Sequence, residues 1–377
     1  MDLSSNFKGI KNISTIGISN LAGSIISAFF WIYLASLLGS ENYGELTYYI
    51  SIAGIVTSIS LVGGPMAITV LVAKKIKIQS TIYVLSISGS IISAIVLYFA
   101  FTNIGISAYI LGAVIYNLAS SELLGRKFYK KYSIYFILQK ILFVLFALIF
   151  YYMIGPEGVL LGIGLSFFIF IDRIYDGFKN TKFNLQLLKN KWAFIRNNFF
   201  IDLTQILNGQ IDKIIIGPVF GFSILGNYYL AVQVLYLLAI LPEAVKHYIL
   251  PEDSSGEDTT KIKILTVIFS IGLALIGIFI APQLLFTLFP EYADLLDLVP
   301  IISISIIPTT VYTLYVSKFL ANEKSGYIVI TSIVSVGVLI SGIFILGEIF
   351  GTVGLAYSLV IFDCTRAFVL FILSRKI

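Results

Sequence analysis

Polar residues recur at three- and four-residue steps along the seventh long apolar stretch of the chain. Asp202, Gln205, Asn208 and Asp212 lie at these steps, and Lys213 follows directly. On a helix this spacing places the side chains on one face. Because an unpaired charge in hydrocarbon costs several kcal/mol, the stripe must meet water or charged partners. We expect Gln205, Asn208 and Lys213 to line a substrate cavity, with Asp202 or Asp212 carrying a coupling Na+ or H+.

A second, weaker stripe lies near the N-terminus, at positions offset by 182 residues from the first. Asn20, Gly23 and Ser27 fall on this stripe, and Ser24 lies on the same face of the helix. If the two helices are equivalent, these four residues line the same cavity. Small residues also suit close packing between membrane helices. That alternative stays open for Gly23, Ser24 and Ser27.

The composition identifies the solvent in which these helices lie. Of the 377 residues, 58% are hydrophobic and 12% are charged, whereas a soluble domain carries about 25% charged residues. This excludes a soluble enzyme, a secreted disulfide module and a receptor with a large ectodomain. A single cysteine precludes an intrachain disulfide, and a single histidine excludes a multi-histidine metal site. We expect no cofactor, and we ascribe the net charge of +5 to loop orientation, not to nucleic-acid binding.

Twelve apolar runs are long enough to span a bilayer, which takes about 20 residues per helix. Strands of a membrane barrel would be about half as long and would alternate in polarity, so the sequence predicts an all-α integral membrane protein. The runs are Ser14–Leu38, Leu46–Ala73, Ser80–Phe101, Ile104–Leu124, Ile134–Ile154, Val159–Tyr175, Asn198–Val219, Ser223–Val245, Ile262–Phe289, Leu295–Leu320, Tyr327–Leu346 and Thr352–Leu373.

The charges in the turns alternate along the chain. Every second turn is rich in lysine and arginine, at 74–77, 126–131, 179–196, 246–263 and 324. The turns between them hold no lysine or arginine, and four of them hold acidic residues, including Glu41 and Glu45, Glu157, Glu291 and Glu348. By the positive-inside rule, this alternation supports twelve spans in the cell membrane with both termini cytoplasmic.

Paired glycines mark an internal repeat. One pair of turns matches at an offset of 182 residues and the other at an offset of 196; the glycines are Gly39 and Gly44 with Gly221 and Gly226, and Gly155 and Gly158 with Gly351 and Gly354. Each half contains six spans, so both halves have the same orientation and the pseudo-twofold axis lies along the membrane normal. The predicted domains are two six-helix bundles, 1–178 and 198–377. A basic segment, 179–197, joins them as a cytoplasmic interfacial helix.

Four further basic residues lie inside or at the ends of spans. Lys140 and Arg366 are about two turns from the inner boundary, where snorkelling would take their charges to water. Arg366 also follows Asp363 by three positions and could pair with it. Arg173 and Lys318 lie at helix ends and suit interfacial anchors. The alternative role of Lys140, Arg173, Lys318 and Arg366 is contact with a substrate head group.

Three acidic residues complete the candidates. Asp172 and Asp176 form a D-x-x-x-D motif, which can bind magnesium diphosphate in intramembrane prenyltransferases. It occurs once, with Arg173 inside it, so an enzyme is the weaker alternative. Glu122 lies near the cytoplasmic boundary, where we expect it to be solvated.

Four segments resemble the polysaccharide flippases of the multidrug/oligosaccharidyl-lipid/polysaccharide exporter superfamily. They are SNLAGSIISAFFWIYLASLLGSENYGELTYYISIAGI from Ser19, NGQIDKIIIGPVFGFSILGNYYLAVQVLYLL from Asn208, FPEYADLLDLVPII from Phe289 and FGTVGLAYSLV from Phe350. The resemblance implies a cationic cavity that receives a diphosphate and a sugar head, with Lys213 as the residue carried over. It departs after Gly63-Gly64-Pro65, where many members have a cation and this chain has Ala67, Ile68 and Thr69.

The function expected from this resemblance is that of a transporter, not an enzyme. It would flip a polyprenyl-linked oligosaccharide from the cytoplasmic to the outer leaflet by alternating access, for cell-surface polysaccharide biosynthesis. The expected partners are this substrate, membrane lipids and glycosyltransferases of the same pathway, around a monomeric protein. No G-x-x-x-x-G-K loop is present, so we do not expect the chain to use ATP. The closest alternative is an ion-coupled antiporter of drugs or metabolites in the same superfamily.

Overall fold

The described part of the chain is built from helices and short turns. The computed structural model describes residues 3–255, 258–292, 294–322 and 324–375. Within these residues nine helical segments are long and apolar enough to cross a membrane. Two of the nine carry two predicted spans each: α1 (Leu3–Leu61), across a kink at Gly39, and α14 (Ser325–Ser374), across a kink at Gly351. The seventh span lies in α8 (Leu185–Phe220), so the described helices account for all twelve predicted spans.

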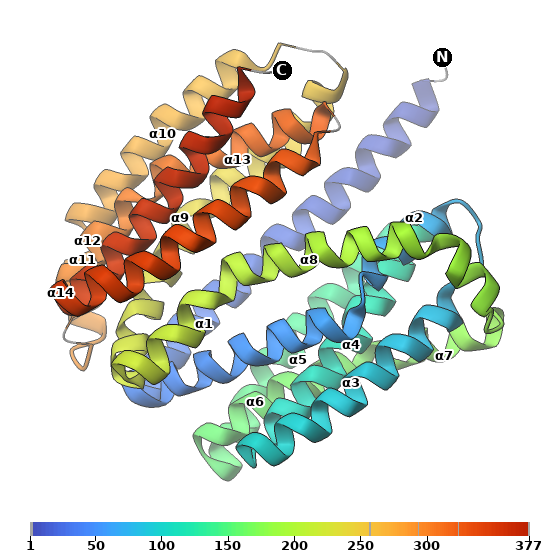
Figure 1. Ribbon diagram of the computed structural model, residues 1–377, viewed down its shortest axis with the longest axis horizontal. Helices are drawn as coiled ribbons and strands as arrows, with labels where there is room; N and C mark the ends of the chain where they lie inside the picture. Colours follow the sequence, from blue (N-terminus) through green and yellow to red (C-terminus); the bar gives the residue numbers. More distant parts are fainter. Residues whose placement is uncertain (1–2, 256–257, 293, 323, 376–377) are drawn as a thin grey trace. The chain divides into compact units, whose positions relative to one another are not determined.

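The remaining helices follow the order of the predicted spans (Figure 1). Spans three to five are single helices, whereas spans six, nine and ten are each divided by a short break. The bounds are α2 (Gly64–Ala73), α3 (Gln79–Phe101), α4 (Ile104–Gly125), α5 (Tyr129–Ile154), α6 (Pro156–Ser166), the 3-10 turn η1 (Phe167–Phe170), α7 (Ile171–Asn180), α9 (Phe222–Ser255), α10 (Thr260–Phe279), α11 (Ala281–Leu288), α12 (Leu295–Ile304) and α13 (Ile306–Ala321).

The second span is interrupted where the sequence predicts a continuous helix. Helix α1 ends at Leu61 and α2 begins at Gly64, after Gly63 adopts a left-handed conformation with a φ of 70°. A Cβ atom at Gly63 would lie 2.4 Å from the carbonyl oxygen of Ile195, so the backbone of α8 occupies the space of a side chain. The break therefore lets α8 approach closely at this point.

The chain divides into two compact units by its internal contacts. The N-terminal unit comprises Met1–Ile26 and Tyr49–Gln210, and the C-terminal unit comprises Ser27–Tyr48 and Ile211–Ile377. These units differ from the predicted halves in two segments. The turn of the first hairpin packs with the C-terminal unit, and the beginning of α8 packs with the N-terminal unit. Within 179–197, residues from Leu185 onward are the first turns of α8, so they continue into the seventh span and do not form a separate interfacial helix.

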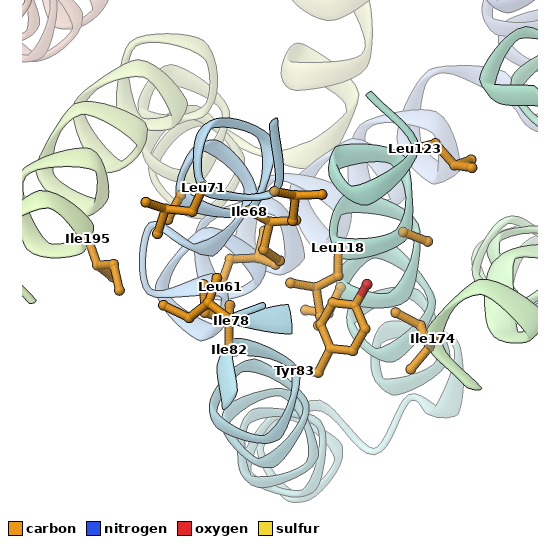
Figure 2. Close-up of a cluster of buried hydrophobic side chains, with 14 of the residues drawn as sticks. Leu61, Ile68, Leu71, Ile78, Ile82, Tyr83, Leu118, Leu123, Ile174 and Ile195 are labelled. Carbon is orange, nitrogen blue, oxygen red and sulfur yellow. The ribbon is translucent and has the colours of Figure 1, made fainter. Parts of the chain in front are cut away.

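The N-terminal unit has a buried apolar core where α2, α3, α4 and α7 meet the beginning of α8. Figure 2 shows this cluster, in which Ile68 of α2, Ile82 and Tyr83 of α3, and Leu118 of α4 point toward one another. Ile195 joins the cluster from α8. These contacts explain why the first turns of α8 belong to this unit.

The glycine repeat recurs as a structural repeat at the turn between the last two spans of each unit. Gly158 packs so closely that a Cβ atom there would lie 2.1 Å from the carbonyl oxygen of Phe150. At the equivalent place, a Cβ atom at Gly354 would lie 1.9 Å from the carbonyl oxygen of Leu346. Both members of each contact are offset by the same 196 residues. The two hairpins, α5–α6 and the two arms of α14, therefore pack in the same way.

The other pair of matched turns meets within the C-terminal unit. A Cβ atom at Gly44 would lie 1.9 Å from the carbonyl oxygen of Phe222, and one at Gly226 would lie 1.9 Å from that of Ser40. The offset of 182 residues relates Ser40 to Phe222 and Gly44 to Gly226, so the contact is reciprocal. The hydroxyls of Ser40 and Ser223 add a hydrogen bond of 2.9 Å. This reciprocal glycine contact holds the first hairpin against the start of α9.

Candidate functional site

The acidic end of the stripe on α8 forms a buried ion pair in the C-terminal unit. Asp212 and Lys213 are each 3% exposed. The Lys213 ammonium lies 3.1 Å and 3.3 Å from the two carboxylate oxygens of Asp212. The Tyr228 hydroxyl, from α9, donates a hydrogen bond of 2.9 Å to Asp212 Oδ2. Both charges therefore have partners within the C-terminal unit.

Aromatic rings surround this ion pair. The Lys213 ammonium lies 5.6 Å from the centre of the Tyr229 ring, within the range of a cation–π contact. Tyr229 in turn packs against Trp31 and Tyr43 of the first hairpin, with ring centres 6.3 Å and 5.6 Å apart. Tyr292 packs on Tyr43, and its hydroxyl donates a hydrogen bond of 2.8 Å to the carbonyl of Ala35. The first hairpin therefore forms one wall around Lys213.

The rest of the α8 stripe belongs to the N-terminal unit and is more accessible. Asp202 and Asn208 are half-buried and Gln205 is exposed. The Oδ1 atom of Asn208 is enclosed and has no hydrogen-bond partner among the described residues. A Cβ atom at Gly209 would meet nothing within 4 Å. In this part of the stripe an amide oxygen of Asn208 lacks a partner and the space beside Gly209 is open. The side chains of Asp212 and Lys213, by contrast, are buried and bonded to one another.

The stripe on α1 lies against α5 within the N-terminal unit. The Tyr132 hydroxyl donates a hydrogen bond of 3.4 Å to Asn20, and a Cβ atom at Gly23 would lie 2.3 Å from the ring of Phe136. Gly23 therefore serves helix packing in this structure.

Ser24, on the same stripe, is exposed. Ser27, assigned by its contacts to the C-terminal unit, has an enclosed hydroxyl with no hydrogen-bond partner among the described residues. Among the predicted cavity and coupling residues, Asp212 and Lys213 bond directly to one another.

A second buried ion pair lies in the last span of the C-terminal unit. Arg366 forms an ion pair with Asp363, which is buried. The guanidinium lies 4.4 Å from the ring centres of both Tyr312 and Phe362. Pairing with Asp363, as its spacing of three residues suggested, thus accounts for this charge without snorkelling.

Both carboxylates of the D-x-x-x-D motif form ion pairs with Arg173, which lies between them in the sequence. Arg173 lies 2.8 Å from a carboxylate oxygen of Asp172 and 2.8 Å from one of Asp176. Tyr135 donates a further hydrogen bond to Asp172. Because a diphosphate-bound metal would need these carboxylates, the arrangement does not fit the alternative of a prenyltransferase. The described residues contain no group of three or more histidine, cysteine or acidic side chains suited to a metal ion.

Lys318 and Lys140, the two lysines considered as head-group contacts, differ in their surroundings. Lys318 lies in the last turn of α13, as expected of an interfacial anchor. Lys140 is half-buried in the middle of α5, and its ammonium lies 5.6 Å and 5.4 Å from the ring centres of Phe136 and Phe143. Among the described residues, no acidic side chain forms an ion pair with it.

We expected Glu122 to be solvated, because it lies near the end of a span, but its side chain is buried. It is 3% exposed, forms an ion pair of 2.6 Å with Arg126, and accepts a hydrogen bond of 3.2 Å from Tyr83. Its spacing of four residues from Arg126 was the available sequence signal for this pair. The long-range contact with Tyr83 depends on the packing of α3 against α4, which no local pattern shows.

Comparisons with known proteins identify the fold. No family model matches the chain, and no curated protein matches its sequence. A multidrug resistance MATE family transporter of the MOP superfamily, in an inward-facing conformation, matches with a TM-score of 0.72 at 15% identity, covering 94% of each chain. The lipid II flippase MurJ, in an inward closed conformation, matches with a TM-score of 0.72 at 13% identity, covering 96% of this chain and 87% of that one.

A third solved structure of the same superfamily comes from Pyrococcus furiosus. It matches with a TM-score of 0.60 at 15% identity, and its description reports a binding pocket of reverse polarity that suggests a different function. The chain therefore has the all-α, twelve-helix membrane fold of the MOP superfamily, with two bundles. Because drug transporters and a lipid flippase share this fold, the fold alone does not select the substrate.

Proposed function

We propose that this chain is a transporter that flips a lipid-linked oligosaccharide from the cytoplasmic to the outer leaflet of the cell membrane by alternating access. The observation that carries this proposal is the embedded ammonium of Lys213, held by Asp212 and the Tyr229 ring. A cation this deep in the membrane costs free energy of folding unless it pairs with or binds an anion. The anion in this proposal is the phosphate group that links the lipid to the sugar.

The geometry suggests how Lys213 exchanges partners. An ammonium has three N–H donors. Beside its bonds to Asp212, the Lys213 ammonium contacts the ring of Tyr229, which packs against Trp31. Both rings are half-buried. When a phosphate competes for the ammonium, the Tyr228 hydroxyl remains on Asp212. Asp212 is then still hydrogen-bonded, and the rings of Trp31 and Tyr229 offer apolar faces to a sugar. The lipid tail stays in the bilayer, while polar groups replace water around the head group.

The embedded acids are paired with resident cations, so a substrate of either charge would have to replace one partner of a pair. Asp212 pairs with Lys213, Asp363 with Arg366, and Glu122 with Arg126. A cationic drug would have to displace a resident cation at each of these carboxylates. Asp202 is half-buried, and no described cation forms an ion pair with it. We therefore assign any coupling to Na+ or H+ to Asp202 in preference to Asp212.

The test is flipping by the purified protein in liposomes. A fluorescent polyprenyl-diphosphate oligosaccharide is placed in one leaflet, and its movement is followed with a quencher that does not cross the membrane. Wild-type protein is expected to flip it. The neutral double variant Asp212→Asn/Lys213→Met removes the charges together, so no lone charge remains buried, and its rate is expected to fall about tenfold or more.

The matched control is Lys246→Met, since Lys246 pairs with Glu243 near the end of α9. It should flip at the wild-type rate. The same vesicles are tested with an amphipathic cationic dye. Transport of the dye without flipping of the lipid would overturn the proposal in favour of the drug antiporter, and unchanged flipping by the double variant would remove Lys213 from the substrate site.

A further inference from the structure

Lys140 has no acidic partner, unlike the other basic residues that lie deep in the described helices. Lys213 pairs with Asp212, Arg366 with Asp363, and Arg173 with Asp172 and Asp176. Among the described residues the Lys140 ammonium contacts two aromatic rings. Rings offset only part of the cost of taking an ammonium out of water. The N-terminal unit therefore contains an embedded positive charge that no acidic side chain of the described residues neutralises.

The position of the ammonium argues against snorkelling. Lys140 is eleven residues from the start of α5 and fourteen from its end, so it lies about 16 Å along the helix. Phe136 is one turn before it and Phe143 nearly one turn after it, yet the two ring centres are almost equally distant, at 5.6 Å and 5.4 Å. The ammonium thus contacts aromatic rings of its own helix, about 16 Å from the helix start, a distance greater than a lysine side chain can span.

The same face of α5 carries the contacts with α1. Ser133 bonds to Ser19, Tyr132 bonds to Asn20, and Phe136 fills the space beside Gly23. Lys140 lies one helical turn beyond Phe136 on this face. It is also half-buried, so one side of it is accessible. Lys140 therefore lies on the face of α5 that carries these contacts with α1.

We propose that Lys140 binds the phosphate linkage of the lipid-linked substrate in the N-terminal unit, with Phe136 and Phe143 holding its ammonium in place. This inference rests on the proposed function, since it assigns a residue to the same substrate. An ammonium that lacks a counter-ion can bind phosphate without first giving up a carboxylate.

The experiment measures binding by the purified full-length protein in nanodiscs. The probes are a polyprenyl diphosphate and the matching uncharged polyprenol. Lys140→Met keeps a flexible side chain of similar length without the charge, and it is expected to weaken binding of the diphosphate at least tenfold while leaving polyprenol binding unchanged. Lys140→Arg should retain most of the diphosphate affinity. The control Lys130→Met, on the exposed first turn of the same helix, should bind both probes as wild type does.

A chemical rescue tests the charge independently of folding. Cys364 is the single cysteine and is exposed, so Lys140→Cys is made in a Cys364→Ser background and then aminoethylated, which restores an ammonium. Diphosphate affinity should be lost in the cysteine variant and recovered after the reaction.

Three results overturn the inference in distinguishable ways. If wild type binds the diphosphate and Lys140→Met binds it equally well, Lys140 has no role and the proposed function stands. If Lys140→Met weakens both probes to the same extent, the residue is structural. If wild type binds no diphosphate, the proposed function fails, and the inference fails with it.

Discussion

Two lysines in membrane-embedded helices illustrate two ways of keeping a charge inside a membrane protein. Lys213 in the C-terminal unit is enclosed and bonded to Asp212, whose other partner is Tyr228. Lys140 in the N-terminal unit is half-buried between two rings. The first is stabilised by a neighbouring charge, and removing either partner leaves the other charge buried alone. The second has no such dependence, so its charge can be removed without leaving a counter-charge behind.

The largest expected effect is on the stability of the paired site. Lys213→Met or Asp212→Asn alone leaves one buried charge without its partner, and each is expected to lower the free energy of unfolding by about 3–5 kcal/mol. The double variant should lose much less, because the pair is replaced by neutral groups. Unfolding of the purified protein in mild detergent measures all three. Lys140→Met is the comparison, and it should stay within about 1 kcal/mol of wild type. Equal losses at Lys140 and Lys213 would contradict the distinction between the two sites.

A smaller effect is expected at the third member of the paired site. Tyr228→Phe removes one hydrogen bond to the charged Asp212 and keeps the ring, so the expected loss of stability is about 1.5–3 kcal/mol. Tyr357→Phe is a matched control, since Tyr357 is exposed on α14. If Tyr228→Phe is as stable as this control, Lys213 alone satisfies Asp212.

The smallest expected effect is the coupling energy between each lysine and a neighbouring aromatic ring. Double-mutant cycles combine Lys140→Met with Phe143→Leu, and Lys213→Met with Tyr229→Leu, and unfolding gives the coupling energy of each pair. The Lys140 pair should couple by about 0.5–2 kcal/mol, because the rings are its described contacts. The Lys213 pair should couple less, since its carboxylate partner dominates. The reverse order would show that the Tyr229 ring, not Asp212, anchors Lys213.

The architecture could be predicted from the sequence because the signals involved are local. Apolar length, the sign of turn charges and paired glycines together predict twelve spans. The packing at Gly158 and Gly354 follows the same offset of 196 residues as the sequence repeat. The break at Gly63 was not predicted, because it depends on the approach of α8 from elsewhere in the chain.

The site was predicted less completely, because helical spacing gives the face of a residue but not its partner. Asp212 and Lys213 are adjacent in sequence, but their burial depends on Tyr228 and Tyr229 of α9 and on the rings of the first hairpin. The bounds of the fifth apolar run indicate the depth of Lys140, and snorkelling is the interpretation that this depth suggests. The contacts of its ammonium with Phe136 and Phe143 come from the structure alone.

The reciprocal glycine contact has a consequence for the two copies of the repeated turn. Ser40 with Gly226 and Phe222 with Gly44 are the same contact made twice, with the roles of the copies exchanged. Such a contact is isologous, the form that a twofold dimer interface takes. Each copy is therefore complementary to itself, and a shorter chain bearing a single copy would have the geometry to pair with a second molecule through this turn.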